Sequence, residues 1–200
     1  MHTNEVARVI AGEAGGRRLT VPSGRSTRPT SDRAREGLFA TVTSVVGSLA
    51  GVRVLDLYAG SGAVGLEALS RGAGHVLLIE SGARAAQVVR QNIAALGLPG
   101  ATVIADRVER ALARGPASGR YDVVFADPPY AMPDDEVTRM LSLLASAGWL
   151  AAGALVVVER ATRSGPLHWP EGFTPDRARR YGEATFWYGR GPEKQPSRQP

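Results

Sequence analysis

The chain has 200 residues, 44% apolar and 22% charged, which is the balance of an ordinary soluble globular protein with one sizeable core. It has no cysteine, which excludes disulfides, cysteine-ligated zinc and a thiol nucleophile, and no apolar run approaches the roughly 18 residues of a membrane span. No signal-peptide pattern opens the chain. We therefore expect a cytoplasmic protein that is monomeric and binds neither a membrane nor a metal.

The first thirty residues are rich in glycine, proline and arginine. Short β-prone pieces at 8–10 and 18–21 flank a glycine-rich turn, which predicts a small β-rich hairpin or arm over residues 1–30. Two acids but seven arginines lie between positions 8 and 35: Arg8, Arg17, Arg18, Arg25, Arg28, Arg33 and Arg35. Such a region attracts polyanions, although a solvated basic face remains the alternative. A second basic cluster, Arg177, Arg179 and Arg180, lies near the end of the chain.

The rest of the chain alternates between helical and strand patterns. Helix-start residues and helical spacing of apolar residues predict a helix over 31–46. Short apolar runs then predict strands at 52–55, 75–79, 102–105, 123–126 and 155–158, and helical stretches lie at 62–70, 83–96, 108–113 and 136–147. This alternation predicts an α/β fold with a mostly parallel sheet covered on both faces. Segments 177–181 and 185–188 predict a closing antiparallel hairpin, and 191–200 a disordered tail.

The most informative motif is Asp127-Pro128-Pro129-Tyr130, which follows the apolar run from Tyr121. Neither proline donates a backbone hydrogen bond and each has a fixed φ, so the segment is stiff and presents carbonyl oxygens beside a carboxylate and a ring. Such acceptors beside a stacking surface suit the NH2 group on the edge of a nucleobase. A simple strand-to-loop turn with a buried tyrosine is the alternative interpretation.

Three more acids, Asp56, Glu80 and Asp106, also stand where predicted strands end. Ligands of open α/β sheets bind outside the carboxyl ends of the strands, so four acids in succession predict the polar rim of one crevice. Any one of them could instead be a helix N-cap.

A glycine-rich loop follows the first of these strands. Gly60, Gly62 and Gly65 fit G-x-G-x-x-G, which is also typical of nicotinamide- and flavin-binding folds. Glu80 lies where an acid can accept hydrogen bonds from ribose hydroxyls. Asp56 would repel a pyrophosphate but can bind a cationic amino-acid group. The electrostatics therefore favour S-adenosylmethionine over NAD, with Asp106 near the adenine amino group.

These two features together predict a methyl transfer to an exocyclic amine. Asp127 and the carbonyl of Pro128 can accept the two amine protons, and Tyr130 can stack on the ring. The attack on the methyl group then needs mainly alignment. A base paired within a helix cannot reach such a pocket, so it must be flipped out or come from a loop.

The chain resembles the RsmD-type bacterial 16S rRNA (guanine-N2)-methyltransferases from Arg8 to about Tyr188. The segments that carry this resemblance are Arg17-Arg-Leu, Thr27-Arg-Pro-Thr30, Asp32-Arg-Ala-Arg-Glu-Gly-Leu-Phe39, Leu55-Asp-Leu-Tyr-Ala-Gly-Ser-Gly62, Leu66-Glu-Ala-Leu-Ser-Arg-Gly-Ala73 and Asp127-Pro-Pro-Tyr130. The resemblance implies a class I methyltransferase (Rossmann-like) domain over 31–190. The implied substrate is the N2 of a 16S rRNA guanine, of the guanine 966 type, in an assembling 30S subunit.

The resemblance also implies roles for residues at matching positions. The cofactor S-adenosylmethionine would be held by Asp56, Tyr58, Gly60, Gly62, Glu80, Asp106, Arg107 and Asp127. The guanine would be held by Asp127, Pro128, Pro129 and Tyr130. RNA would be bound by Arg8, Arg17, Arg18, Arg25, Arg28 and Thr30, with residues 1–30 as the RNA-binding arm. Two departures, Tyr58 for an expected Phe and Ala11 for an expected Gly, remove no chemical group.

Other functions remain open at this point. The same chemistry could act on adenine N6 in DNA or on a glutamine side chain, and Asp127-Pro-Pro-Tyr130 alone does not separate these. A non-catalytic RNA-binding assembly factor is a second alternative, although intact Asp56, Glu80 and Asp127 argue against it. A nicotinamide-dependent oxidoreductase is a third, which calorimetry of cofactor binding would distinguish.

Overall fold

The structure, a computed structural model, describes residues 7–22 and 31–193. Seven strands form one sheet in the order β3-β2-β1-β4-β5-β7-β6. The strands are β1 (Arg53–Leu57), β2 (His75–Ile79), β3 (Ala101–Ile104), β4 (Tyr121–Ala126), β5 (Leu150–Ala161), β6 (Thr174–Tyr181) and β7 (Ala184–Arg190). Strands β1 to β5 are parallel, and β7 pairs antiparallel with both β5 and β6. The predicted α/β fold with a closing antiparallel hairpin is confirmed.

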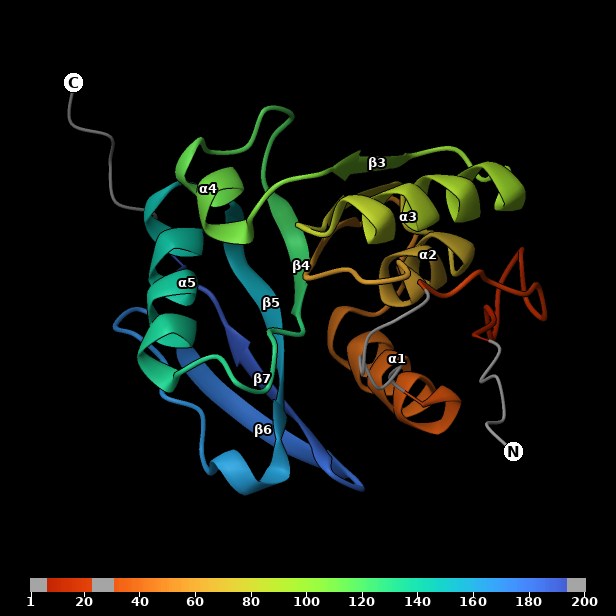
Figure 1. Cartoon of the computed structure of the whole chain (residues 1–200). Coiled ribbons are helices and arrows are strands. Elements are labelled where there is room, and N and C mark those ends of the chain that lie inside the picture. The colour runs from red at the N-terminus through yellow and green to blue at the C-terminus, as the bar shows by residue number, and fades with distance from the viewer. Residues whose placement is uncertain (1–6, 23–30, 194–200) are drawn as a thin grey trace.

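Helices cover both faces of the sheet (Figure 1). On one face lie α1 (Asp32–Val46), α2 (Ala63–Ser70) and α3 (Ala83–Leu96), and on the other lie α4 (Val108–Ala113) and α5 (Asp134–Ser146). Because both faces are buried, the central strands are almost continuously apolar, as β2 (His-Val-Leu-Leu-Ile) illustrates. A short 3-10 helix, Thr162–Ser164, follows β5.

In the described part of the predicted N-terminal arm, residues 7–22, an isolated antiparallel β-bridge joins Arg8 and Arg18, and the Leu19 amide donates to the Ala7 carbonyl at 2.7 Å. The segment packs closely on the α/β domain, beside α2 and α3 (Figure 1). Its buried apolar residues share a cluster with Leu66 of α2 and Leu96 of α3. This burial holds the segment against the sheet domain.

The end of the described chain is also attached to the sheet. The Gly191 amide donates to the Ala154 carbonyl at 2.8 Å, and the Pro192 carbonyl accepts from the Gly153 amide at 3.3 Å. Of the expected tail 191–200, the first three residues therefore lie against β5, and 194–200 lie outside the described residues. No helix of the described part of the chain is long and apolar enough to cross a membrane.

Candidate active site

Four acids gather at the carboxyl edge of the parallel strands. Glu80 directly follows β2, Asp127 directly follows β4, and Asp106 lies two residues beyond β3. Asp56 lies inside β1, one residue before its end, and not after the strand as the sequence suggested. Because β1 to β4 are neighbours and parallel, all four acids come to one edge, where open α/β sheets bind ligands.

Asp56 is a buried carboxylate, with only 4% of its surface exposed. Its Oδ2 accepts a hydrogen bond of 2.8 Å from the Gly65 amide in the first turn of α2. A Cβ on residue 65 would lie 3.0 Å from the same oxygen, so Gly65 permits this close approach. Burial raises the pKa of Asp56 to about 7, with a further rise from Glu80, whereas the Gly65 hydrogen bond opposes it. A nearby cation would stabilise the charged form.

The glycine loop that joins β1 to α2 has an unusual backbone. Tyr58, Gly60 and Gly62 all have positive φ, at 61°, 57° and 81°, and Tyr58 is the one such non-glycine residue in the described chain. No atom lies within 4 Å of a Cβ built on Gly60, so a ligand can approach the backbone there. Glu80 ties this loop to the next one, accepting from the Gly60 amide at 2.9 Å and the Gly82 amide at 2.6 Å.

Tyr58 is half-buried between the loop and α4. Its hydroxyl donates to Glu109 Oε1 at 2.9 Å. Burial, and then the charge of Glu109, raise the pKa of Tyr58 far above its ordinary value, so the phenol stays neutral. The ring is therefore fixed in orientation beside the glycine loop.

Asp106 and Arg107 precede α4. The Asp106 carboxylate accepts from the Arg107 amide at 2.8 Å and pairs with Arg114 at 2.5 Å, and Arg110 lies at 3.7 Å. Desolvation raises the pKa of Asp106, but these hydrogen bonds and positive charges outweigh it and lower the pKa. The acid is thus ionised and already occupied, while the Arg107 side chain is exposed.

The Asp127-Pro-Pro-Tyr130 segment leaves β4 as a stiff loop. Asp127 remains accessible to solvent while the surrounding protein displaces much of its water. This desolvation, together with the negative charges of Glu159 and Asp56, raises the pKa of Asp127 well above its ordinary value, and Arg160 opposes the rise. No described residue donates to the Pro128 carbonyl, whereas the Pro129 carbonyl accepts from the Met132 amide at 2.8 Å.

Two residues of the candidate site that sequence reasoning missed, Glu159 and Arg160, come from the end of β5. Glu159 is 7% exposed and accepts from the Tyr130 hydroxyl at 3.1 Å. Arg160 is 3% exposed and donates to the carbonyls of Met132 at 2.8 Å and Pro129 at 3.4 Å. Through these hydrogen bonds, Glu159 and Arg160 hold the loop that follows β4 in place. The signal was available, because Glu159 is a fifth acid directly after the apolar run 155–158.

A small hollow lies at this edge, on the face of the sheet that α1 covers, between the end of β1 and the ends of β4 and β5. Its lining residues come from α1, the start of α2, and strands β1, β4, β5 and β7: Leu38, Asp56, Val64, Phe125, Ala126, Asp127, Val157, Glu159 and Phe186. Three carboxylates thus share one hollow whose remaining walls are apolar. Glu80, Asp106 and Tyr58 lie outside this lining, on the glycine-loop side.

Comparison with known proteins identifies the relatives of this chain. Residues 7–190 match the sequence profile of the family described as "Conserved hypothetical protein 95". The chain belongs to this family. It is 39% identical to ribosomal RNA small subunit methyltransferase D of Escherichia coli K12 over 166 residues, covering 81% of this chain and 80% of that protein. The corresponding enzyme of Haemophilus influenzae is 36% identical over 169 residues, 84% of each chain.

Solved structures agree with this family assignment. The structure of the Escherichia coli protein yhhF superposes with a TM-score of 0.83 at 32% identity, covering 94% of this chain and 99% of that one. More distantly, SMU.776, a structure complexed with SAH, shares the fold at a TM-score of 0.59 and 16% identity over 76% of this chain and 48% of that one. The resemblance to RsmD-type enzymes and the methyltransferase fold class are confirmed.

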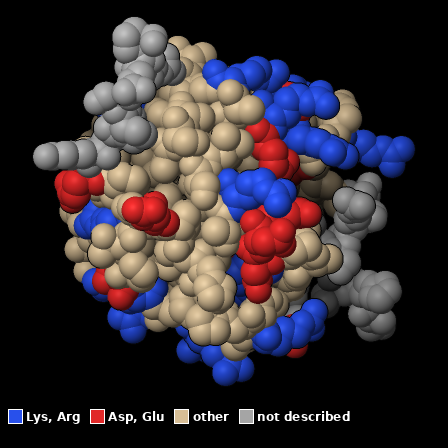
Figure 2. Space-filling model, turned by 90° about the vertical axis from the view of Figure 1, so that its left-hand side faces the viewer, with Lys and Arg blue, Asp and Glu red and all other residues tan. Residues whose placement is uncertain are grey.

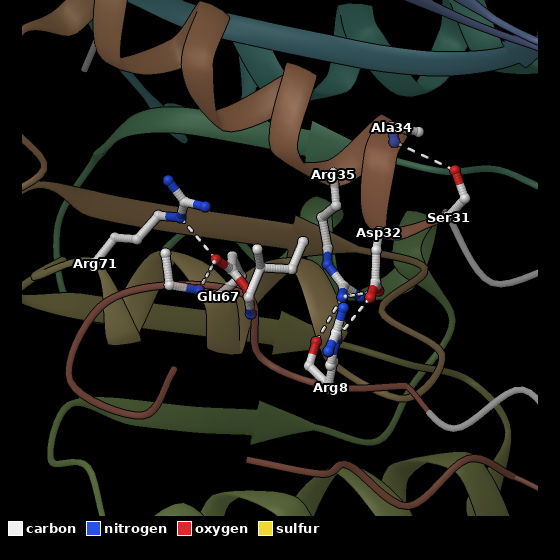
Figure 3. Close-up of polar contacts among 9 residues, drawn as sticks. Arg8, Ser31, Asp32, Ala34, Arg35, Glu67 and Arg71 are labelled. Carbon is white, nitrogen blue, oxygen red and sulfur yellow. Dashed lines mark hydrogen bonds and ion pairs between the residues drawn. The ribbon is translucent and has the colours of Figure 1, made fainter. Parts of the chain in front are cut away.

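Among the family's RNA-binding candidates, Arg8 and Arg17 are engaged within the protein. Arg8 pairs with Asp32 at 2.8 Å (Figure 3). Arg17 donates to the carbonyls of Ala95 and, at 2.8 Å, Leu96, and so caps the last turn of α3. Arg18 is exposed, and Arg25, Arg28 and Thr30 lie outside the described residues.

The family segment Leu66-Glu-Ala-Leu-Ser-Arg-Gly-Ala73 has a structural explanation. Glu67 is fully buried, and it accepts from the amides of Ile10 at 2.6 Å and Ala11 at 3.1 Å and from Arg71 Nε at 2.7 Å (Figure 3). Ser70 bonds the same segment further along, at Ala14. The motif thus anchors residues 10–14 rather than a ligand.

Arg35 completes this anchor from α1. Its guanidinium, 1% exposed, donates to the Arg8 carbonyl and to Asp32 Oδ1 (Figure 3). Burial lowers the pKa of Arg35, while the charges of Glu67 and Asp32 act in the opposite sense. The buried charges of Glu67 on α2 and Arg35 on α1 thus fix the N-terminal segment to these two helices.

Proposed function

We propose that this protein transfers the methyl group of S-adenosylmethionine to the exocyclic N2 of a guanine of 16S rRNA, of the guanine 966 type, in an assembling 30S subunit. Its methyltransferase fold and its relatives, which are named for ribosomal RNA methylation, support the coarser part of this assignment. The single observation that supports a planar amine as the acceptor is the hollow that Asp127 and Glu159 line together with Asp56. The choice of a guanine N2 in 16S rRNA rests on the resemblance to the RsmD-type enzymes.

The residues at the β1–β3 half of the edge fit the cofactor. Asp56 is a buried carboxyl that accepts one amide hydrogen bond, so its ionised form can bind the ammonium of the methionine end, and the positive charge of that group would offset the burial that raises the pKa of Asp56. Gly60 leaves room for close approach, and Gly62 opens α2 in the left-handed conformation. Glu80 would accept from the ribose hydroxyls, and Asp106 with Arg107 would border the adenine. The cofactor, when bound, supplies an electrophilic methyl group on a sulfonium.

The β4–β5 half of the edge fits a planar amine. Asp127 and the Pro128 carbonyl would accept the two protons of the guanine N2 amine and draw its lone pair out of the ring. Tyr130 would stack on the base, with its hydroxyl held by Glu159 at 3.1 Å. The raised pKa of Asp127 makes it a stronger base, so it can take the proton that the nitrogen loses as its bond to carbon forms.

The decisive experiment compares possible acceptors directly. The protein and labelled S-adenosylmethionine are incubated with naked 16S rRNA, undermethylated small subunits, DNA and a glutamine-containing peptide, and the labelled atom is then mapped by mass spectrometry. We expect label on a guanine N2 of the small subunit. Label on adenine N6 or on glutamine would contradict the guanine assignment, and RNA binding with no transfer to any acceptor would favour the assembly factor.

A further inference from the structure

The strand β6 is a basic edge that the functions described so far do not use. It is the outermost strand of the sheet, and all its residues except Tyr181 are exposed. Arg177, Arg179 and Arg180 lie on it. In Figure 1, β6 and β7 extend as a hairpin from the side of the sheet that carries β5.

Two rows of paired residues connect the hollow to this strand. Strand neighbours in register place their side chains on the same face of a sheet. The first row runs across five strands: Asp56, Phe125, Val157, Tyr188 and Arg177. The second row starts one residue beyond the Ala126–Val158 pair and runs: Asp127, Glu159, Phe186 and Arg179.

The first three members of each row line the hollow, so both arginines lie on its face of the sheet. Adjacent strands are roughly 4.8 Å apart, which puts β6 about 10 Å from β5 and about 14 Å from β4. A chain of a few nucleotides spans this distance.

The surroundings of two tyrosines, Tyr181 and Tyr188, indicate which face of the sheet these arginines occupy. Tyr181, next on this face of β6, packs its ring on Phe186 with centroids 5.5 Å apart and touches Gly37 of α1. Burial raises the pKa of Tyr188 to about 12, and the nearby charges of Arg179 and Arg177 oppose this rise. Arg177 and Arg179 therefore lie on the face of the sheet that α1 covers, which is also the face that carries the hollow.

The opposite face of the sheet, which α4 and α5 cover, differs in its charged side chains. On the side of the molecule that carries α4 and α5, basic side chains gather toward the upper right, and acidic side chains lie directly beside them (Figure 2). The first turn of α5 alone carries Asp134, Asp135 and Glu136. On β6, Arg177 is paired with Asp176 at 3.0 Å, but both side chains are partly exposed, and such surface pairs are weak.

We propose that Arg177 and Arg179 bind the phosphates of the nucleotides that flank the target base, and so lead the RNA strand from the hollow across the C-terminal hairpin. This inference rests on the proposed function, because it assumes a nucleobase in the hollow. Charged side chains on an edge strand also prevent edge-to-edge pairing. A purely protective role would require no RNA contact.

The test measures RNA affinity against salt concentration for wild type and for R177A/R179A, with undermethylated small subunits as the ligand. The logarithm of the binding constant falls as the logarithm of the salt concentration rises. Each lost phosphate contact to a single strand makes this slope less steep by about 0.7, so the slope of the double variant should be less steep by about 1.4. The control R120A/R139A removes the same charge at the amino edge of the sheet and on α5, and we expect the wild-type slope. R177K/R179K should retain most of the slope.

A second measurement locates the contact. Since the chain has no cysteine, Ala178→Cys provides a single thiol between Arg177 and Arg179, on the other face of this edge strand, and a tethered RNA-cleaving reagent there can reach around the edge. We expect cleavage within a few nucleotides of the methylated base. Cleavage only at distant sites would overturn the inference.

The two proposals can fail separately. Wild-type methylation of guanine N2 together with an unchanged slope in R177A/R179A would overturn the β6 contact and leave the function intact. Aggregation of that variant, seen by size-exclusion chromatography, with normal RNA affinity would assign the arginines to edge protection. Absence of RNA methylation by wild type would overturn the function. Calorimetry should give the same S-adenosylmethionine affinity for all variants.

Discussion

The two halves of the carboxyl edge are built from different groups. In the β1–β3 half, the acids accept hydrogen bonds from backbone amides: Asp56 from Gly65, Glu80 from Gly60 and Gly82, and Asp106 from Arg107. In the β4–β5 half, the side chains of Tyr130 and Arg160 make the contacts: the Tyr130 hydroxyl donates to Glu159, and Arg160 donates to the Met132 carbonyl in the loop after β4. In the half proposed for the cofactor the acids are therefore held mainly by backbone amides, with Arg114 also on Asp106, and in the half proposed for the base the contacts come from side chains. Substitutions in one half should therefore change cofactor affinity, and substitutions in the other half should change methyl transfer.

The largest effect is expected from Asp127→Asn. This change removes the proton acceptor while preserving shape, so methyl transfer should fall at least about 100-fold. S-adenosylmethionine affinity, measured by calorimetry, should stay near wild type because the cofactor half is untouched. Asp135→Asn, an exposed acid on α5, serves as the control. Wild-type turnover in D127N would refute the mechanism.

Asp56→Asn should act on the other half. Loss of a charge-assisted contact to the ammonium should weaken S-adenosylmethionine binding roughly 10- to 100-fold. The folded-state pKa of Asp56 is raised to about 7, so the folded protein holds a proton that the unfolded chain loses above about pH 4. Stability is therefore lost as pH rises from about 4 to 7, and D56N should escape this loss.

The thermal midpoint of D56N should then exceed that of wild type at pH 8 by roughly 5 °C. The matched control is Asp122→Asn on β4, an exposed carboxylate that also accepts one amide hydrogen bond, from Arg53 at 2.9 Å. We expect neither its cofactor affinity nor its midpoint to change. Equal midpoints of D56N and wild type at pH 8 would contradict the raised pKa.

Cofactor binding should also depend on pH. Asp56 must lose its proton to pair with an ammonium, so S-adenosylmethionine affinity should rise most steeply near pH 7, by about tenfold between pH 6 and pH 8, and level off at higher pH. Calorimetry in two buffers of different ionisation enthalpy should detect proton release at pH 6. A flat affinity profile would remove Asp56 from the ammonium site.

The smallest effect is expected from Tyr130→Phe. The ring remains for stacking, but its 3.1 Å hydrogen bond to Glu159 is lost, so kcat/KM should fall only about threefold. Tyr121→Phe, at the amino end of β4, should leave it unchanged. If Y130F lowered cofactor affinity instead, the division between the two halves would be wrong.

The sequence was sufficient to predict the sheet because its strands are short apolar runs with clear ends. The helix 83–96 and the strand 75–79 have the bounds expected of them. It was also sufficient to bring Asp56, Glu80, Asp106 and Asp127 to one edge, since parallel neighbours share their carboxyl ends.

The rest depends on contacts between residues distant in sequence. Glu159 and Arg160 were missed because β5 continues to Ala161, beyond the apolar run that ends at 158. The sequence predicts that Arg17 binds RNA, and the structure adds a contact that the sequence does not show: Arg17 caps α3 at the carbonyl of Leu96, seventy-nine residues later in the chain. A count of arginines records charge and not the partners that already hold it.

The anchor at Glu67 has a consequence for the order in which the chain folds. Residues 10 and 11 are bound by a side chain that lies more than fifty positions later, and Leu19 packs in a cluster that includes Leu96. During synthesis these partners do not yet exist when the N-terminal segment leaves the ribosome. Residues 10, 11 and 19 therefore cannot reach their final positions before α2 and α3 have been made.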